Sequence, residues 1–87
     1  MSNGRREVAR AFGQTLKAAR EAQSLSQEQL AEGAELDRST PSLYERGLRQ
    51  PTLTALIDIA RALSMDPAQL VAATIEKLRW DSSLSLH

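Results

Sequence analysis

Basic and acidic side chains are segregated along this 87-residue chain, although its formal net charge at pH 7 is zero. Residues 1–20 contain five arginines or lysines and a single acidic residue, Glu7, whereas residues 21–36 contain four glutamates and no base. A neutral protein can still present a basic face to phosphate groups, because only the charges on the contacting face meet the ligand. The zero net charge argues only against strong, indiscriminate binding of nucleic acid.

Side chains suited to catalysis or metal binding are scarce. The sequence has no cysteine, and its single histidine is the last residue, His87. It has no glycine-rich phosphate loop and no His, Asp and Glu cluster at metal-ligand spacing. Neighbouring charges such as Asp58 with Arg61, or Glu76 with Lys77, are typical of solvated helix surfaces. The sequence therefore indicates neither an enzyme nor a bound cofactor or metal.

The composition is typical of one small helical domain. The chain is long enough for one core and too short for two. Hydrophobic residues make up 41% and aromatic residues 3% of the sequence, so the core must be built from Leu, Ile, Val and Ala, which suit helices. No apolar stretch approaches the roughly 20 residues that span a bilayer, and the charged N-terminus is not followed by a hydrophobic segment. We therefore expect a cytoplasmic protein that does not enter a membrane.

Apolar spacing predicts an all-α fold of five short helices, without strands. The clearest start signal is Ser26, which forms a capping box with Gln29 ahead of the second helix. The expected helices cover residues 7–23, residues 27–34, a third segment ending at Arg46, a fourth beginning after Thr52 and a fifth beginning at Pro67. The expected domain covers residues 7–80, between a flexible arm at 1–6 and a flexible tail at 81–87.

Residues 25–63 carry several motifs in a fixed order. LSQEQLA is followed by RST, by ERG and a basic loop, and then by a proline and the pattern LxxLIxIAxAL. Together these closely resemble the lambda-repressor/Cro-type helix-turn-helix (XRE) family. The resemblance implies a compact five-helix domain whose second and third helices form the helix-turn-helix that binds the major groove of double-stranded DNA. The function it implies is a sequence-specific transcriptional regulator, a repressor that binds a palindromic operator as a homodimer through its third helix.

The same resemblance implies roles for individual residues. Gln27 matches a position that grips a phosphate. Arg38 and Ser39 match the main base-reading positions, and Arg38 could donate two hydrogen bonds to guanine O6 and N7. Leu43 matches another such position, where it offers only apolar contact. The other implied DNA contacts come from Thr40 and Ser42, to bases or phosphates, and from Arg46, Arg49 and Gln50, to phosphates. For Arg49 and Gln50, a solvated surface position is an equally good interpretation.

Two further features have mainly structural interpretations. Glu45 resembles the family's internal ion-pair residue, whose partner is an arginine of the first helix, here Arg10 or Arg20. Arg5 and Arg6 could form an arm around the duplex, as in some relatives. Such a pair is more often a solubilising tail, and we favour that interpretation.

Two residues depart from the family pattern. The turn after the second helix usually has a left-handed glycine where this chain has Glu35. A glutamate costs roughly 1 kcal/mol in that conformation, so we expect the turn to be slightly reshaped. Pro41 lacks the amide hydrogen that a helix interior needs. If Asp37 caps the third helix, Pro41 is strained in the first turn; if Thr40 caps it, Pro41 is a favourable first residue and Arg38 lies in the preceding loop. Either start predicts DNA contacts that are shifted from the family norm.

A domain of this size reads only a few base pairs, so we expect a dimer on half-sites about 10 bp apart. The interface is expected on the fifth helix and just after it, at Ile75, Leu78 and Trp80, because Trp is enriched at interface centres. The alternative is an antitoxin-like or other protein-interaction module with a regulatory protein as partner, in which DNA binding is secondary or lost. Pro41, Leu43 and the zero net charge leave room for it.

Overall fold

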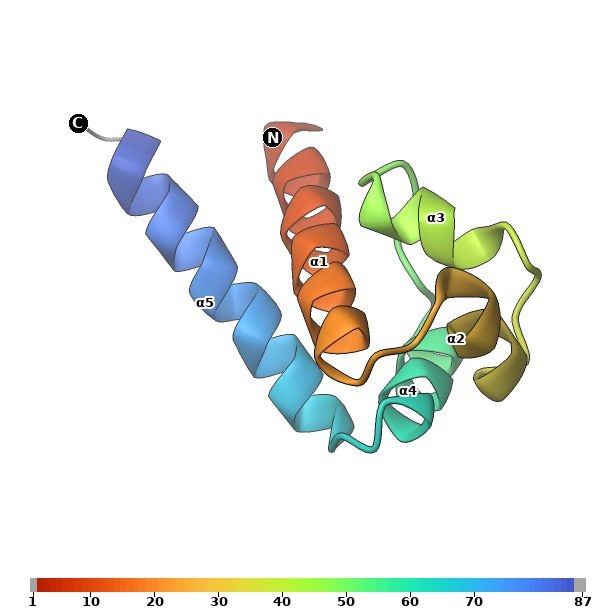
Figure 1. The fold of residues 1–87 in the computed structure, drawn as a ribbon. Coiled ribbons are helices and arrows are strands. Elements are labelled where there is room, and N and C mark those ends of the chain that lie inside the picture. Colours follow the sequence, from red (N-terminus) through yellow and green to blue (C-terminus); the bar gives the residue numbers. More distant parts are fainter. Residues whose placement is uncertain (1, 86–87) are drawn as a thin grey trace.

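The computed structural model describes the backbone of residues 2–85 and the side chains of residues 4–79. This part of the chain forms five helices and no strand, so the all-α prediction is confirmed. The helices are α1 (Ser2–Ala22), α2 (Gln27–Gly33), α3 (Thr40–Glu45), α4 (Leu53–Ala62) and α5 (Pro67–Ser85) (Figure 1). Within the described segment, none of them is long and apolar enough to cross a membrane.

α1 is the central helix of the fold. It packs against α3 on one side and α5 on the other, while α2 packs against α3 and α4, and α4 against α5 (Figure 1). Phe12 and Tyr44 meet edge to face where α1 contacts α3, with ring centroids 5.9 Å apart. The rest of the core is aliphatic, as the composition predicted. Its completely buried residues include Leu16, Leu30, Ile59, Leu63 and Leu70.

The first four helices end in the same way. After each helix, one residue adopts a left-handed conformation and the next donates its amide hydrogen to the carbonyl five residues back, which is a Schellman motif. The left-handed residues are Ser24, Glu35, Gly47 and Ser64, with φ angles of 57°, 56°, 73° and 56°. Glu35 adopts the left-handed conformation itself, and its turn has the same hydrogen bonds as the other three, so the expected reshaping of this turn is not seen. An apolar residue follows each one, and three of these four pack on the core, whereas Leu48 remains 65% exposed.

Both ends of the chain are more helical than expected. α1 already begins at Ser2, within the predicted arm at 1–6, and α5 runs to Ser85, within the predicted tail at 81–87. No proline interrupts either segment, so neither helix meets a strong breaker. The domain boundaries themselves stay a prediction. Residues 1, 86 and 87 lie outside the described part of the chain.

α3 begins close to the later of the two predicted starts. Ser39 is the N-cap and Thr40 the first helical residue, so Pro41 is the second. Its missing amide hydrogen removes no bond there, because first-turn amides have no partner within the helix. The Thr40 amide instead donates to the Asp37 carbonyl at 3.0 Å. Arg38 therefore lies in the turn before α3, as the later start predicted.

Candidate nucleic-acid interface

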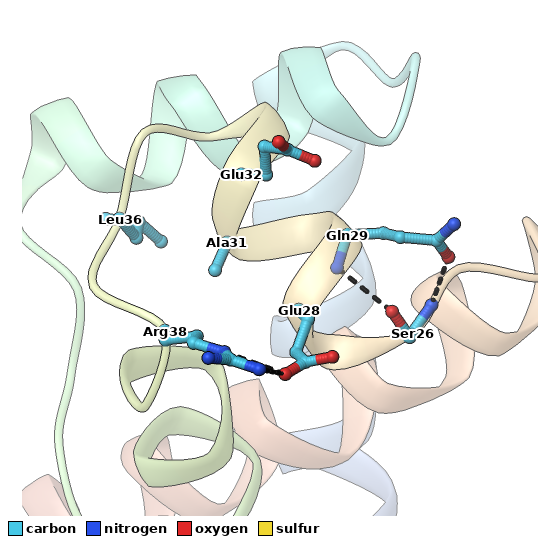
Figure 2. A pocket seen from close by; sticks show the side chains of 7 residues that line it. All are labelled: Ser26, Glu28, Gln29, Ala31, Glu32, Leu36 and Arg38. Carbon is cyan, nitrogen blue, oxygen red and sulfur yellow. Dashed lines mark hydrogen bonds and ion pairs between the residues drawn. The ribbon is translucent and has the colours of Figure 1, made fainter.

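The start of α2 is fixed by the predicted capping box. The Ser26 hydroxyl accepts a hydrogen bond from the Gln29 amide at 3.0 Å, and the Gln29 side-chain oxygen accepts one from the Ser26 amide at 2.8 Å (Figure 2). Leu30 and Ala31 are buried and hold α2 against the core, while Leu36 packs on the same core from the turn that follows. The helix that precedes α3 is thus held at both ends.

A buried ion pair then fixes α3 relative to α1. Arg20 donates from Nε to Glu45 Oε2 at 2.7 Å and from Nη2 to Oε1 at 3.1 Å, and its Nη1 donates to the Leu25 carbonyl at 2.7 Å. Only 12% of the Arg20 side chain and 5% of the Glu45 side chain are exposed. The hydrogen bond to Glu45 raises the pKa of Arg20 above its ordinary value. Of the two partners predicted for Glu45, the structure therefore selects Arg20 over Arg10.

Gln27 belongs to the same network. Its side-chain amide donates to Glu45 Oε1 at 3.0 Å, so one of its two amide hydrogens is held by a carboxylate inside the protein. Because Gln27 is half-buried, only part of the side chain faces solvent. A phosphate contact by Gln27 stays a prediction, and it has to use the remaining hydrogen.

Arg38 reaches back from the turn before α3 to α2 (Figure 2). Its Nε donates to Glu28 Oε2 at 2.7 Å, and its Nη2 donates to the same oxygen. The two side chains are 80% and 61% exposed, so water screens the pair and limits its contribution to stability to about 0–1 kcal/mol. An arginine has five N–H donors, so Arg38 keeps donors for another partner.

The other α3 residues predicted to contact DNA differ in how far they are exposed to solvent. Arg46 is exposed, and Ser42 and Leu43 are half-buried on the same side of this short helix. Thr40 is an exception, because it is only 7% exposed and packs into the protein rather than toward solvent. The prediction that Thr40 reaches bases or phosphates stays a prediction, and its burial leaves little of the side chain for such a contact.

Arg49 and Gln50 lie in the loop between α3 and α4, and both are exposed. The Gln50 side-chain amide donates to the Arg5 carbonyl of α1 at 3.0 Å. Burial raises the pKa of Tyr44, and the positive charge of Arg49 acts in the opposite direction. The loop is therefore fastened to α1 and carries its positive charge close to the end of α3.

Gly13 is a positioning residue that the sequence analysis missed. A Cβ atom there would collide with the backbone carbonyl oxygens of Tyr44 and Glu45, at 2.9 Å from the latter. Only glycine allows α1 to pass this close beneath α3. A signal for this was present, because a glycine inside an apolar helical pattern costs about 1 kcal/mol and often marks a close approach.

Two of the three predicted dimer residues, Ile75 and Leu78, line an apolar groove of about 280 Å³ between α1 and α5. Ile75 is 44% exposed and Leu78 is half-buried, and Val8 and Val71 also line the groove with more than a third of their surface exposed. The side chain of Trp80 lies outside the described residues. Over residues 4–79, no group of three or more His, Cys, Asp or Glu could hold a metal ion.

Comparison with known sequences identifies a family and a relative. A family model described as a helix-turn-helix domain matches residues 11–73. The chain is also 47% identical over 53 residues to an uncharacterized HTH-type transcriptional regulator, y4dL, from Sinorhizobium fredii. That match covers 61% of this chain but only 27% of the relative, so this chain spans about a quarter of the relative's length.

Solved structures share the arrangement of helices. The restriction-modification controller protein C.AhdI from Aeromonas hydrophila is 42% identical, with a TM-score of 0.69 over 71% of this chain and 94% of C.AhdI. The controller protein C.Esp1396I, solved as a tetramer with its natural 35 base-pair operator, is 25% identical, with a TM-score of 0.74 over 82% and 93% of the two chains. The clp gene regulator ClgR from Corynebacterium glutamicum, at 19% identity, shares the fold with a TM-score of 0.84 over 90% and 83%.

Proposed function

This chain belongs to the helix-turn-helix domain family, as its motifs predicted, and we propose that it is a DNA-binding transcriptional regulator. Its five helices have the lambda-repressor-like arrangement. The observation that carries the proposal is the position of Arg38, which is 80% exposed at the entrance to α3 and is held only by a solvent-screened pair. A guanidinium in this position can exchange a carboxylate for a guanine edge at little cost.

We assign base reading to the turn before α3 and to the exposed side of that helix. Arg38 donates to guanine O6 and N7, with Ser39 and Ser42 as shorter-range donors. Leu43 contributes apolar contact, for example with a thymine methyl group. The phosphate contacts are assigned to Gln27, through its second amide hydrogen, and to Arg46, Arg49 and Gln50.

We further propose that the protein acts as a homodimer that represses by occupying a palindromic operator. The apolar groove beside Ile75 and Leu78 supports a second copy of this chain as the occupant of that face, because exposed aliphatic side chains gather there. Trp80 completes the proposed interface. The operator complex of the similar C.Esp1396I contains that protein as a tetramer, which is consistent with assembly on DNA.

Selection of binding sites from a random duplex library, at low and near-physiological salt, tests this proposal. We expect a two-fold symmetric motif that survives the higher salt. Arg38→Ala should lose about 1–3 kcal/mol of discrimination at one base pair of each half-site, whereas Lys17→Ala, an exposed change in the middle of α1, should not. If no motif emerges, or if binding vanishes with salt, the antitoxin-like interaction module becomes the better account, and a pull-down should identify its partner.

A further inference from the structure

The exposed arginines that are assigned to DNA contact differ in their partners. Within residues 4–79, Arg38 forms an ion pair with Glu28, whereas Arg46 and Arg49 pair with no carboxylate. The two arginines assigned to phosphates therefore keep their full positive charge. Arg38, which is assigned to base reading, instead has its charge offset by a carboxylate of α2.

The fold of α2 keeps the Glu28 carboxylate beside Arg38. Glu28 lies in the first turn of α2, whose start is fixed by the capping box of Ser26 and Gln29. Ala31, in the next turn, is 2% exposed and packs α2 into the protein. Although the Glu28 side chain is 61% exposed, the backbone that carries it cannot move away without breaking these contacts.

The turn before α3 holds Arg38 on the other side of the pair (Figure 2). The Leu36 amide donates to the Ala31 carbonyl at 2.8 Å, which ties the beginning of the turn to α2. The Thr40 amide donates to the Asp37 carbonyl at 3.0 Å, which closes the turn at the start of α3. With the backbone fixed on both sides, Arg38 uses Nε and Nη2 for the carboxylate and keeps Nη1 for another partner.

The surroundings of the pair are acidic. A hollow of about 680 Å³ lies between α2 and the turn, and its charged lining residues are Glu28 and Glu32 against Arg38 alone (Figure 2). A phosphate seated on Arg38 would approach a carboxylate as well, and the two negative charges would repel each other through a water-screened interaction. A guanine edge carries no net charge and offers only the acceptors O6 and N7. The carboxylate therefore opposes a phosphate contact by Arg38 but not a guanine contact.

We propose that Glu28 is a specificity-determining residue that acts through Arg38. Because its backbone is fixed, its negative charge stays near the guanidinium in any DNA complex, where it disfavours the phosphate contact that Arg38 could otherwise make on every sequence. Glu28 thus weakens binding to mixed-sequence DNA more than binding to a site with guanine at the Arg38 position, and discrimination rises. The inference rests on the proposed function, since it needs Arg38 to read a base.

A double-mutant cycle, measured on the selected site and on mixed-sequence duplex DNA, tests this role. Glu28→Gln should tighten mixed-sequence binding by about two- to fivefold, the range of a screened interaction between exposed charges, and should tighten binding to the selected site by less. The matched control Glu32→Gln removes the same charge from another exposed position on α2. In an Arg38→Ala background, Glu28→Gln should have no more effect than Glu32→Gln.

The salt dependence of binding gives a second readout, which a merely structural role for Glu28 would not move. In Glu28→Gln, Arg38 gains a phosphate contact on mixed-sequence DNA, so the slope of log K against log salt should steepen by up to about 0.9. The slope for Glu32→Gln should steepen less. Thermal melts should show that all the variants fold.

The outcomes separate this inference from the function on which it rests. If the wild-type protein selects a motif but Glu28→Gln leaves the ratio of the two affinities unchanged, the inference is wrong and the proposed function stands. An equal change in Glu32→Gln, or an effect of Glu28→Gln that persists without Arg38, also overturns it. If the wild-type protein selects no motif, the proposed function fails and the inference fails with it.

Discussion

The protein contains two arginine–glutamate pairs that use the same chemistry in opposite surroundings. Arg20 and Glu45 are 12% and 5% exposed and share two hydrogen bonds, with further bonds to Leu25 and from Gln27. Arg38 and Glu28 are 80% and 61% exposed and meet at one carboxylate oxygen. The first pair joins α1 to α3, whereas the second joins α2 to the turn before α3.

Burial decides what each pair can do. We call Arg20–Glu45 the inner pair and Arg38–Glu28 the outer pair. Removing one partner of the largely buried inner pair leaves the other charge uncompensated inside the protein, so Arg20 and Glu45 cannot change partners at little cost. The outer pair is screened by water and contributes little to the free energy of unfolding, so Arg38 can change partners at little cost. The inner pair therefore fixes α3 relative to α1, and the outer pair leaves the guanidinium of Arg38 available for the DNA contact that we propose.

The largest expected effect is on stability and comes from removing the carboxylate of Glu45. Glu45→Ala should lower the free energy of unfolding by about 3–5 kcal/mol, because Arg20 then remains buried without its partner. Urea denaturation of the isolated protein measures this change. Arg38→Ala, which breaks the outer pair, should change the free energy of unfolding by less than about 1 kcal/mol. Equal losses from the two variants would show that burial does not distinguish the pairs.

A smaller effect is expected from Gly13, which brings Glu45 close enough to α1 for the inner pair to form. Gly13→Ala should destabilise the protein by about 1–3 kcal/mol through overpacking, since the atoms in the way are backbone carbonyls that cannot rotate aside. Gly4→Ala is the matched control on the same helix, because nothing lies within 4 Å of the added atom. The control should be neutral or stabilising. Destabilisation by the Gly4 change, or tolerance of the Gly13 change, would contradict the close approach.

These pairs also show how far the sequence could predict the structure. Each helix has an apolar face, and α2 and α4 begin at strong caps, so the existence of the helices and the buried faces followed from periodicity alone. The outer ends of α1 and α5 did not, because the sequence there lacks a periodic apolar pattern that shows where a helix stops. The turn at Glu35 was expected to be slightly reshaped because it lacks glycine, but Glu35 takes up the left-handed conformation and the ordinary turn forms.

The sequence named candidate residues for the site, and which of them contact DNA stays a prediction; the contacts within the protein were harder to predict. Motif order placed Arg38 at the entrance to α3, yet its pairing with Glu28 depends on how the turn folds back in space. Glu45 had two possible partners, because Arg10 and Arg20 lie on the same helix and only packing chooses between them. Local spacing also did not reveal that Thr40, the first residue of α3, is buried.

The smallest expected effect concerns the outer pair and tests whether Glu28 competes with DNA for Arg38. If Glu28 competes with DNA for Arg38, Glu28→Gln should tighten binding to any duplex by up to about fivefold, which corresponds to the roughly 1 kcal/mol that an exposed pair contributes at most. Discrimination between specific and mixed-sequence duplexes should fall, because a freed Arg38 can also settle on phosphates. The free energy of unfolding should fall by no more than the same amount, about 1 kcal/mol.

Glu32→Gln is the control for that change, since it removes the same charge from the same helix, one turn further on. Figure 2 shows Glu32 at the end of α2 away from Arg38. Equal gains in affinity from both variants would reduce the effect to a general loss of negative charge. Weaker specific binding by Glu28→Gln alone would reverse the interpretation, because Glu28 would then hold Arg38 in its reading position instead of competing for it. Binding titrations on the selected site and on mixed-sequence DNA therefore decide whether the outer pair restrains recognition or prepares it.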